Sequence, residues 1–274
     1  RLDTGVKTLP DFMKDATDRN RTSPFAFTGN KFEFRSVGSQ DSVAQANVVL
    51  NTIVAEAFCE ACDELEKAED FSLAVHNLIK KYATEHQRII FNGDGYSKEW
   101  VKEAERRGLP NLKSMVDAIP AYLDPKSVAA FEKFGVFTKA ELESRVEVEY
   151  ETYAKSINIE GRAMIDIASK QIIPAVIRYT TMLGNSLATV RNACPEADVS
   201  VQTELLLETS ALLSDTKVAL AKLTDVVDQA KEMPRGKEQA VFFHEKIIPA
   251  MAELRSPVDA LEMIVDKEMW PMPS

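Results

Sequence analysis

Apolar and polar residues alternate with a helical period along most of the chain. Between Asp41 and about Lys67 the apolar residues recur three and four positions apart, which is the spacing of one face of an α-helix. We expect this helix to pack along that face, with Asp41 or Ser42 as its N-cap. Similar patterns and their capping residues predict shorter helices at 71–85, 98–107, 112–119 and 126–134.

A much longer helix is predicted from Thr138 towards Cys194. Its apolar residues form a single stripe with steps of three and four between Ile165 and Val190. Pro174 lies inside this stripe and should kink the helix, because proline has no N–H group and its ring crowds the preceding turn. Gly161 is a second expected weak point.

Two more long helices follow in the last third of the chain. Apolar pairs recur every seven residues from Leu205-Leu206 to Val226-Val227, and the segment 233–236 ends that helix. The last helix has a strict heptad seam from Ile247 to Val265, which Pro249 and Pro257 should bend without ending. Three long helices with short links predict a large antiparallel helical bundle over 138–274. The expected fold is therefore mainly α.

The exception is a short β-strand near the N-terminus, at Asn30–Arg35. Phe32 and Phe34 point to one side, while Lys31, Glu33 and Arg35 point to the other, which is the period of a half-buried strand. A carboxylate among arginines suits a hard cation and anionic oxygens, because guanidinium groups bind phosphate or carboxylate in a bidentate manner. From the residues alone, a surface strand with a cross-strand ion pair remains an alternative.

Charge narrows the choice of partners. The net charge of −10 argues against nucleic acid or an anionic membrane as the main partner. Residues 1–40 contain seven Lys and Arg and five Asp and Glu, so this basic segment is the part expected to meet an anionic ligand. No stretch approaches the roughly 20 apolar residues that a membrane span requires.

The cysteines indicate a reducing compartment, and we expect a cytoplasmic protein. Cys59, Cys62 and Cys194 make no disulfide framework. The Cys59-x-x-Cys62 pair lies in a helical pattern without a second pair at zinc spacing, so we interpret it as two small helix residues. The chain begins without Met in a loop-like stretch, which leads us to expect a fragment of a longer protein.

Two short motifs resemble those of a known enzyme family. Asn20-Arg21-Thr22-Ser23, followed by Phe32-Glu33-Phe34-Arg35, is similar to the paired NRS and R-[IL]-E-x-R-F motifs of glutamine synthetases. The amino-acid sequence from Asn20 to Arg35 resembles that of the type III, long-chain bacterial branch. The segment 39–47 falls where the family has a D-P-x-x-N-P-Y loop, and 116–153 resembles the C-terminal helices of ordinary members.

The resemblance implies an ATP-dependent ligase that joins ammonia to L-glutamate through a γ-glutamyl phosphate, with Mg²⁺ or Mn²⁺. It implies that Glu33 is a metal ligand and that Arg35 is catalytic and holds glutamate or the phosphoryl group. Arg21 would bind ATP phosphates. The family's second arginine after NRS is replaced by Ala26, for which Arg19 could substitute. The other metal ligands and the nucleotide-binding residues are expected upstream of this chain.

The resemblance also divides the chain in two. Residues 1–137 would be the C-terminal part of a glutamine synthetase catalytic domain, and 138–274 a type III-specific helical bundle. Family members form rings, so we expect a homo-oligomer, a dodecamer in the full-length protein, in which the bundle contributes contacts between subunits. The alternative is a free-standing helical-bundle interaction or regulatory module without catalytic activity.

Overall fold

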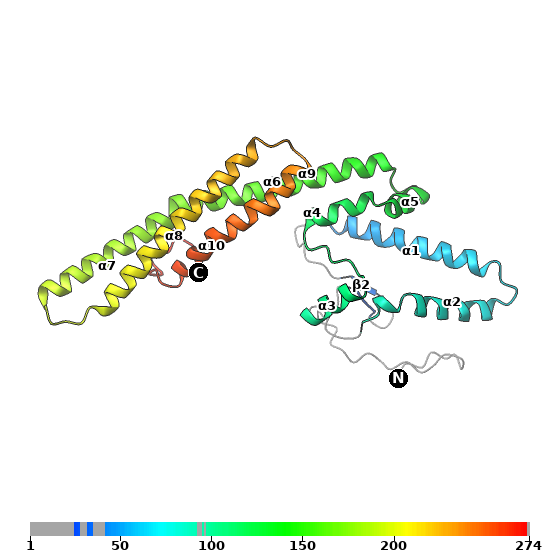
Figure 1. The fold of residues 1–274 in the computed structure, drawn as a ribbon, viewed down its shortest axis with the longest axis horizontal. Helices are drawn as coiled ribbons and strands as arrows, with labels where there is room; N and C mark the ends of the chain where they lie inside the picture. The colour runs from blue at the N-terminus through cyan, green and yellow to red at the C-terminus, as the bar shows by residue number, and fades with distance from the viewer. Residues whose placement is uncertain (1–24, 28–31, 35–41, 92–94, 96, 273–274) are drawn as a thin grey trace. The chain divides into compact units, whose positions relative to one another are not determined.

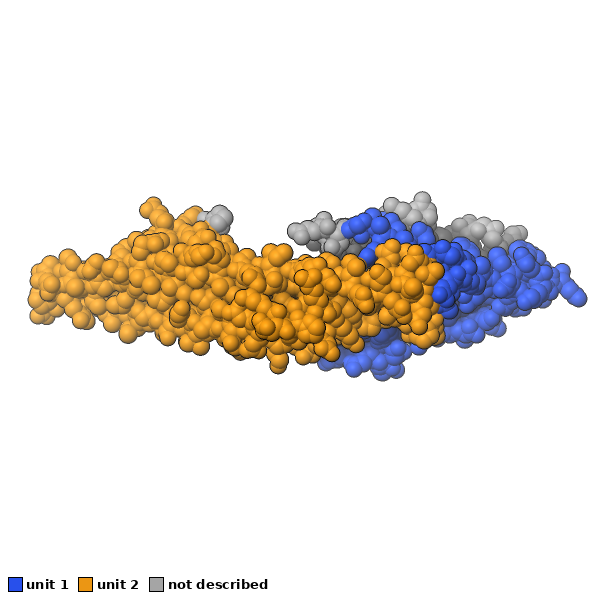
Figure 2. Space-filling view, turned by 90° about the horizontal axis from the view of Figure 1, so that it is seen from above, with its two compact units in different colours: residues 1–113, 129–136 blue, residues 114–128, 137–274 orange. Residues whose placement is uncertain are grey.

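The computed structural model describes residues 25–27, 32–34, 42–91, 95 and 97–272 of the chain (Figure 1). Most of these residues are helical, so the prediction of a mainly α fold is confirmed. The chain forms two compact units, residues 1–113 with 129–136 and residues 114–128 with 137–274 (Figure 2). The domain boundary between 137 and 138 was predicted from the family resemblance, and it stays a prediction.

Two short antiparallel strands form the β-structure among the described residues of unit 1. Strand β1 covers Phe25–Phe27 and strand β2 covers Phe32–Phe34. Glu33 pairs with Ala26 at the centre of the ladder. Strand β2 lies inside the segment for which the period of two predicts a strand, whereas β1 was not predicted. That these strands belong to the sheet of a larger catalytic domain stays a prediction.

The helices of unit 1 agree with the predicted ones to within a few residues. Asp70 and Ser97 cap α2 and α3 through side-chain oxygens that accept from the N–H groups of Leu73 and Trp100. Gly108, at φ +71°, follows α3 in a conformation that favours glycine. These elements are α1 (Ala44–Leu65), α2 (Phe71–Glu85), the 3₁₀ turn η1 (Gln87–Ile89) and α3 (Lys98–Arg106).

Helix α1 departs from prediction at its apolar face and at its cap. Thr52 is its buried residue, while Ile53, Val54 and Phe58 are about half exposed or more. The predicted packing along one face is therefore wrong for the described residues. Asp41 lies outside the described residues, and Ser42 accepts a hydrogen bond from the N–H of Ala44 without standing at the N-cap position itself.

Unit 2 begins with short elements and then a long capped helix. Thr138 and Glu141 form a reciprocal capping box at the start of α6, in which each side chain bonds the other's backbone N–H. This cap fixes the start of the bundle at the predicted residue. The elements up to this helix are α4 (Met115–Ala118), the 3₁₀ turn η2 (Ile119–Leu123), α5 (Pro125–Lys133, whose first residues are assigned to unit 2 and whose last residues to unit 1) and α6 (Lys139–Ile167).

The helix that starts at Thr138 loosens into a π-helical turn just before Pro174. The turn, η3, covers Ala168–Ile172, and α7 continues over Ile173–Ala193. A wider turn accommodates a proline, which offers no N–H and crowds the carbonyl four residues earlier. Gly161 does not weaken the helix as predicted, because α6 passes through it without interruption.

The last helix repeats this arrangement. After α8 (Ser200–Lys231), the chain forms α9 (Lys237–Phe242), the π-helical turn η4 (Phe243–Ile247) and α10 (Ile248–Glu262). Both π turns end at the first residue of the sequence Ile-Ile-Pro-Ala, which occurs at residues 172–175 and 247–250. Pro257 stays inside α10, which confirms that it does not end the helix.

The three long helical segments pack as an antiparallel bundle. In Figure 1 the chain runs along α6 and α7, returns along α8 and reverses again along α9 and α10. One core cluster joins α6, α8 and α10 around Leu223, Ile247 and Leu254. A second joins α7, α8 and the C-terminal residues around Val176, Leu183 and Leu261. The predicted bundle is therefore confirmed. None of the described helices is long and apolar enough to cross a membrane.

Candidate functional site

Glu33 is the predicted metal ligand that lies within the described residues. It occupies the middle of β2, and its side chain is half-buried. The pairing with Ala26 places it on a two-stranded ladder, which holds a backbone more rigidly than a loop does. Arg19, Arg21 and Arg35, the predicted phosphate-binding and catalytic residues, lie outside the described residues.

A complete metal site is absent from the described residues. They contain no group of three or more His, Cys, Asp and Glu side chains placed to hold an ion. Cys59 and Cys62 are free thiols on α1. Glu33 could therefore supply one carboxylate ligand, and the other ligands of such an ion would have to come from elsewhere.

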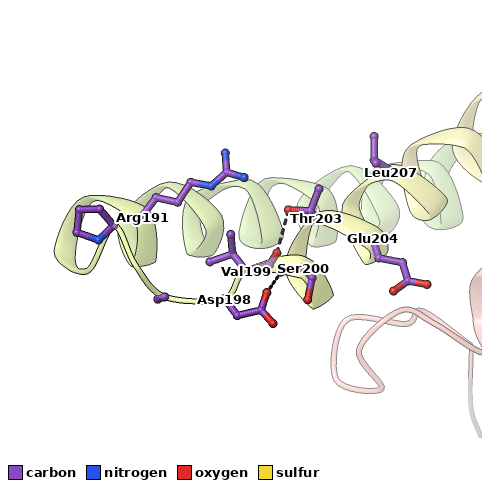
Figure 3. Close-up of a pocket in the computed structure, with 9 residues that line it drawn as sticks. Arg191, Asp198, Val199, Ser200, Thr203, Glu204 and Leu207 are labelled. Atoms are coloured by element: carbon purple, nitrogen blue, oxygen red, sulfur yellow. Dashed lines mark hydrogen bonds between the residues drawn. The ribbon is translucent and has the colours of Figure 1, made fainter.

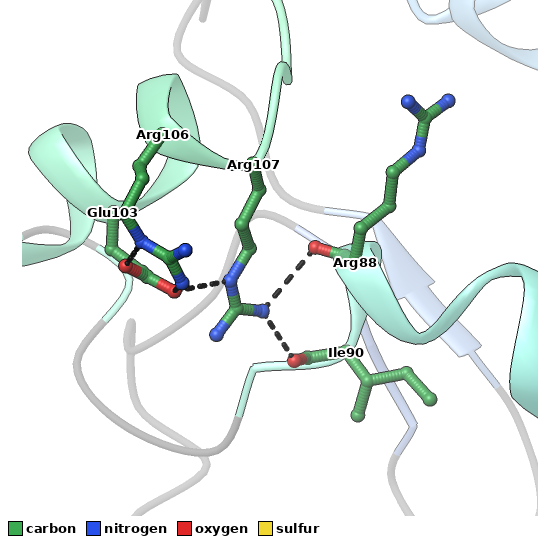
Figure 4. Close-up of polar contacts among 5 residues, drawn as sticks. All are labelled: Arg88, Ile90, Glu103, Arg106 and Arg107. Atoms are coloured by element: carbon green, nitrogen blue, oxygen red, sulfur yellow. Dashed lines mark hydrogen bonds and ion pairs between the residues drawn. The ribbon is translucent and has the colours of Figure 1, made fainter.

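A compact polar cluster in unit 1 ties α3 to the segment before it (Figure 4). The guanidinium group of Arg107 donates to the backbone carbonyls of Arg88 and Ile90, at 3.2 and 2.9 Å. Its Nε also donates to a carboxylate oxygen of Glu103 at 2.6 Å. One arginine thus closes residues 88–90 against the end of α3.

Glu103 accepts from two arginines at once. Arg106 makes a bidentate pair with it, with both donor–acceptor distances at 2.7 Å. These hydrogen bonds, from Arg106 first and Arg107 second, lower the pKa of Glu103 to about 2. The carboxylate is therefore ionised at any physiological pH. Trp100 stacks on Phe91 at 4.0 Å, and Arg107 lies over the Trp100 ring. These contacts hold the segment 88–91 against the end of α3.

A hollow of about 830 Å³ lies at the turn between α7 and α8 (Figure 3). Arg191 of α7 lines it together with Thr203, Glu204 and Leu207 of α8. Asp198 accepts a hydrogen bond from the N–H of Ser200 at 2.9 Å. The hollow is broadly open to solvent, so it resembles a docking surface more than an enclosed ligand site.

Sequence reasoning missed these two features for different reasons. The spacing of Glu103, Arg106 and Arg107 at three and four could have indicated a local ion pair. Nothing in the spacing indicated that Arg107 would reach carbonyls 17 and 19 residues away. The hollow depends on how α7 and α8 pack, which a helical pattern does not specify.

Comparison with known proteins gives a consistent result over nearly the whole chain. Residues 74–191 match the model of the glutamine synthetase C-terminal domain. A glutamine synthetase of Bacteroides fragilis is 35% identical over 99% of the chain, and a type-3 glutamine synthetase of Dictyostelium discoideum is 37% identical over 99%. A glutamine synthetase of Butyrivibrio fibrisolvens is 34% identical over 96%.

The chain spans 38% of the length of each of these relatives. The similarity includes the bundle as well as the region of the two short motifs, since it covers 96–99% of the chain. With the resemblance of the motifs and the match to the C-terminal domain, these comparisons show that the chain is similar to glutamine synthetases over nearly its whole length.

Proposed function

We propose that this chain is part of an ATP-dependent ligase that joins ammonia to L-glutamate. In this reaction the γ-phosphoryl group of ATP is transferred to the side-chain carboxylate of glutamate, and ammonia then displaces phosphate to give glutamine. The observation that carries the proposal is the similarity to glutamine synthetases over 96–99% of the chain. The finer assignments rest on the resemblance of the motifs around Arg21 and Glu33.

The proposed roles follow from the charge that phosphoryl transfer must neutralise. Glu33 would contribute a carboxylate to a Mg²⁺ or Mn²⁺ ion, and its place in the middle of β2 suits a fixed ligand. Arg35 would hold the glutamate carboxylate or the transferred phosphoryl group. Arg21 would bind ATP phosphates, and Arg19 would supply the charge that Ala26 does not.

A divalent ion, when bound, would neutralise charge that develops on the phosphoryl oxygens. The described residues offer Glu33 and no group of three ligands. The proposal therefore gives this chain one ligand and leaves the rest to other parts of the protein. ATP, glutamate and ammonia are proposed substrates, and a ring-shaped homo-oligomer is the proposed assembly.

The proposal is tested by measuring ATP-dependent glutamine formation by the protein at its full natural length. Glu33→Ala should lose nearly all turnover and bind Mn²⁺ more weakly, because an ion that loses a carboxylate ligand is left undercharged. Phe32→Leu should instead reduce mainly thermal stability. Glu105→Gln is a matched control, because Glu105 is an exposed carboxylate on α3.

Two results would contradict the proposal. Wild-type kinetics in a well-folded Glu33→Ala protein would remove the metal assignment. Absence of glutamine formation by the wild-type protein, under conditions in which a known glutamine synthetase is active, would favour the alternative of a non-catalytic interaction or regulatory module.

A further inference from the structure

Two of the three cysteines of the chain lie one helical turn apart on α1. Cys59 is half-buried and Cys62 is exposed, and both are free thiols. Side chains three positions apart on an α-helix are neighbours, with Cβ atoms about 5–6 Å apart. The two sulfur atoms can therefore reach a common point beside α1, and the exposure of Cys62 leaves that point open to solvent.

The spacing of this pair suits a bridging ion better than a disulfide. A disulfide requires Cβ atoms about 3.5–4.5 Å apart, so closing one between Cys59 and Cys62 would distort α1, which is continuous here. A metal–thiolate bond is about 2.3 Å long, so two such bonds on opposite sides of an ion separate the sulfur atoms by about 4.6 Å. Two helical cysteines one turn apart span this distance without a change in the backbone.

The number of available ligands selects the kind of ion. Structural zinc takes four ligands, and Mg²⁺ and Ca²⁺ take about six or more, mainly oxygen. The described residues contain no group of three or more His, Cys, Asp and Glu placed around one point. Two thiolates are a complete ligand set for Cu⁺, a soft ion that thiolates select and that accepts two ligands in a line.

A cationic side chain from α5 lies beside Cys59. The end of α5 belongs to the same compact unit as α1. The Nζ atom of Lys133 lies 2.7 Å from a carboxylate oxygen of Glu56, which precedes Cys59 by three positions on the same side of α1. The pKa of Lys133 is raised first by this contact and also by the charge of Cys59. Two thiolates and one Cu⁺ leave a single negative charge, which the nearby ammonium group offsets.

We propose that Cys59 and Cys62 bind one Cu⁺ ion as a two-coordinate dithiolate, with Lys133 as the partner that offsets its charge. On binding, each thiol releases its proton and each sulfur donates an electron pair to the ion, so nothing is oxidised or reduced. The absence of a second cysteine pair at zinc spacing concerns zinc and leaves an ion with two ligands open. The inference is independent of the proposed ligase activity, because neither cysteine has a role in that proposal.

The test is an anaerobic titration of the reduced 274-residue chain with Cu⁺, in competition with the chromogenic chelator bicinchoninate. One Cu⁺ per chain should be withheld from the chelator, and X-ray absorption should show two sulfur ligands. Cys59→Ser and Cys62→Ser should each weaken binding by more than about a hundredfold, since losing an outer-shell partner alone costs about 10–100-fold. Cys194→Ser is the matched control: it removes the third, exposed cysteine at the end of α7 and should bind like wild type.

A relocated cysteine tests the spacing itself. The double variant Ala61→Cys with Cys62→Ser keeps the number of thiols but places two of them two positions apart, where side chains do not face each other. It should bind as weakly as the single variants, while Lys133→Gln should weaken binding about tenfold. Circular dichroism checks that each variant is as helical as wild type.

Three results would overturn the site. These are a wild-type chain that withholds no Cu⁺ from bicinchoninate, wild-type affinity in Cys59→Ser or Cys62→Ser, and wild-type affinity in the relocated variant. Unchanged binding by Lys133→Gln would remove the lysine from the proposal.

Discussion

The hydroxyl of Tyr153 lies 3.1 Å from Nδ1 of His244 and joins α6 to the π-helical turn η4. The contact links residues 91 positions apart in the sequence. The two rings are tilted against each other, with centroids 6.5 Å apart. A π turn exposes backbone groups that an α-helix would bond, so a side-chain hydrogen bond at this turn helps to fix its position in the bundle.

A double-mutant cycle measures this contact. Tyr153→Phe and His244→Ala should each destabilise the chain, and their coupling energy should be about 1 kcal/mol, the usual value for a side-chain hydrogen bond. Chemical unfolding monitored by circular dichroism gives the four free energies. A coupling energy near zero would show that the hydrogen bond adds nothing to stability.

One buried and one half-buried tyrosine make unit 2 sensitive to high pH. Burial raises the pKa of Tyr150 above its usual 10.0, and burial, with Asp117 and Glu160, raises the pKa of Tyr153. The folded chain therefore holds protons that the unfolded chain releases, so their stabilising effect is complete below about pH 10 and is lost as pH rises further. Urea midpoints between pH 8 and 11 should fall more steeply for wild type than for Tyr150→Phe. Equal slopes would contradict the prediction.

At Gly161 the bundle has room for a methyl group but not for a larger side chain. A Cβ there would lie 3.4 Å from Val227 and 3.6 Å from Ile247, which is ordinary van der Waals contact. Gly161→Ala should therefore be neutral or stabilise the bundle by up to about 1 kcal/mol through helix propensity. Gly161→Leu should destabilise it by about 1–3 kcal/mol through overpacking. Thermal melts of both variants test this; equal destabilisation would show that the site accepts no side chain.

Sequence reasoning succeeded where local chemistry decides the structure. The capping box of Thr138 and Glu141 and the caps at Asp70 and Ser97 depend on residues three positions apart, so the starts of α6, α2 and α3 could be predicted. The long helices could be predicted because burial against two neighbours leaves a periodic stripe in the sequence.

Sequence reasoning failed where packing at a distance decides. The apolar period of α1 predicts burial, but burial needs a covering surface, and Phe58 remains 66% exposed among the described residues. The π turns before Pro174 and Pro249 were foreseen only as bends. The repeated sequence Ile-Ile-Pro-Ala could have indicated that the two prolines share one local structure. Of the candidate site, the strand around Glu33 was predictable from its period of two, whereas the ligand set was carried by resemblance alone.

The hydrogen bonds from Arg107 to the carbonyls of Arg88 and Ile90 can be tested apart from the ion pairs of Glu103. The low pKa of Glu103, about 2, means that its ionised form is favoured by folding; this stabilisation is present above pH 4.5 and is lost as pH falls through 2. Arg106→Ala and Arg107→Ala should both raise this pKa in an NMR titration of the carboxyl carbon.

Only Arg107→Ala should speed hydrogen exchange at residues 88–90, because Arg107 is the arginine of the two that bonds the carbonyls of Arg88 and Ile90. Arg106→Ala is thus the matched control. Equal exchange in the two variants would show that the segment is held by its aromatic contacts instead.

Two buried threonines on α8 give the final prediction. Thr209 and Thr216 are both fully buried. The hydroxyl of Thr216 donates to the carbonyl of Leu212 at 2.8 Å, whereas that of Thr209 has no hydrogen-bond partner among the residues that the structure describes. An unpaired buried hydroxyl costs about 1–3 kcal/mol, and valine has nearly the same shape without it. Thr209→Val should therefore raise the free energy of unfolding, by about 1 kcal/mol or more.

Thr216→Val is the matched control, because it removes a hydroxyl that is satisfied. It should be neutral or slightly destabilising, since the carbonyl of Leu212 loses one donor. Urea unfolding of the two variants side by side measures the difference in their free energies of unfolding. If Thr209→Val is no more stable than Thr216→Val, the Thr209 hydroxyl is satisfied in solution, and a buried water bound to it would be the first explanation to examine.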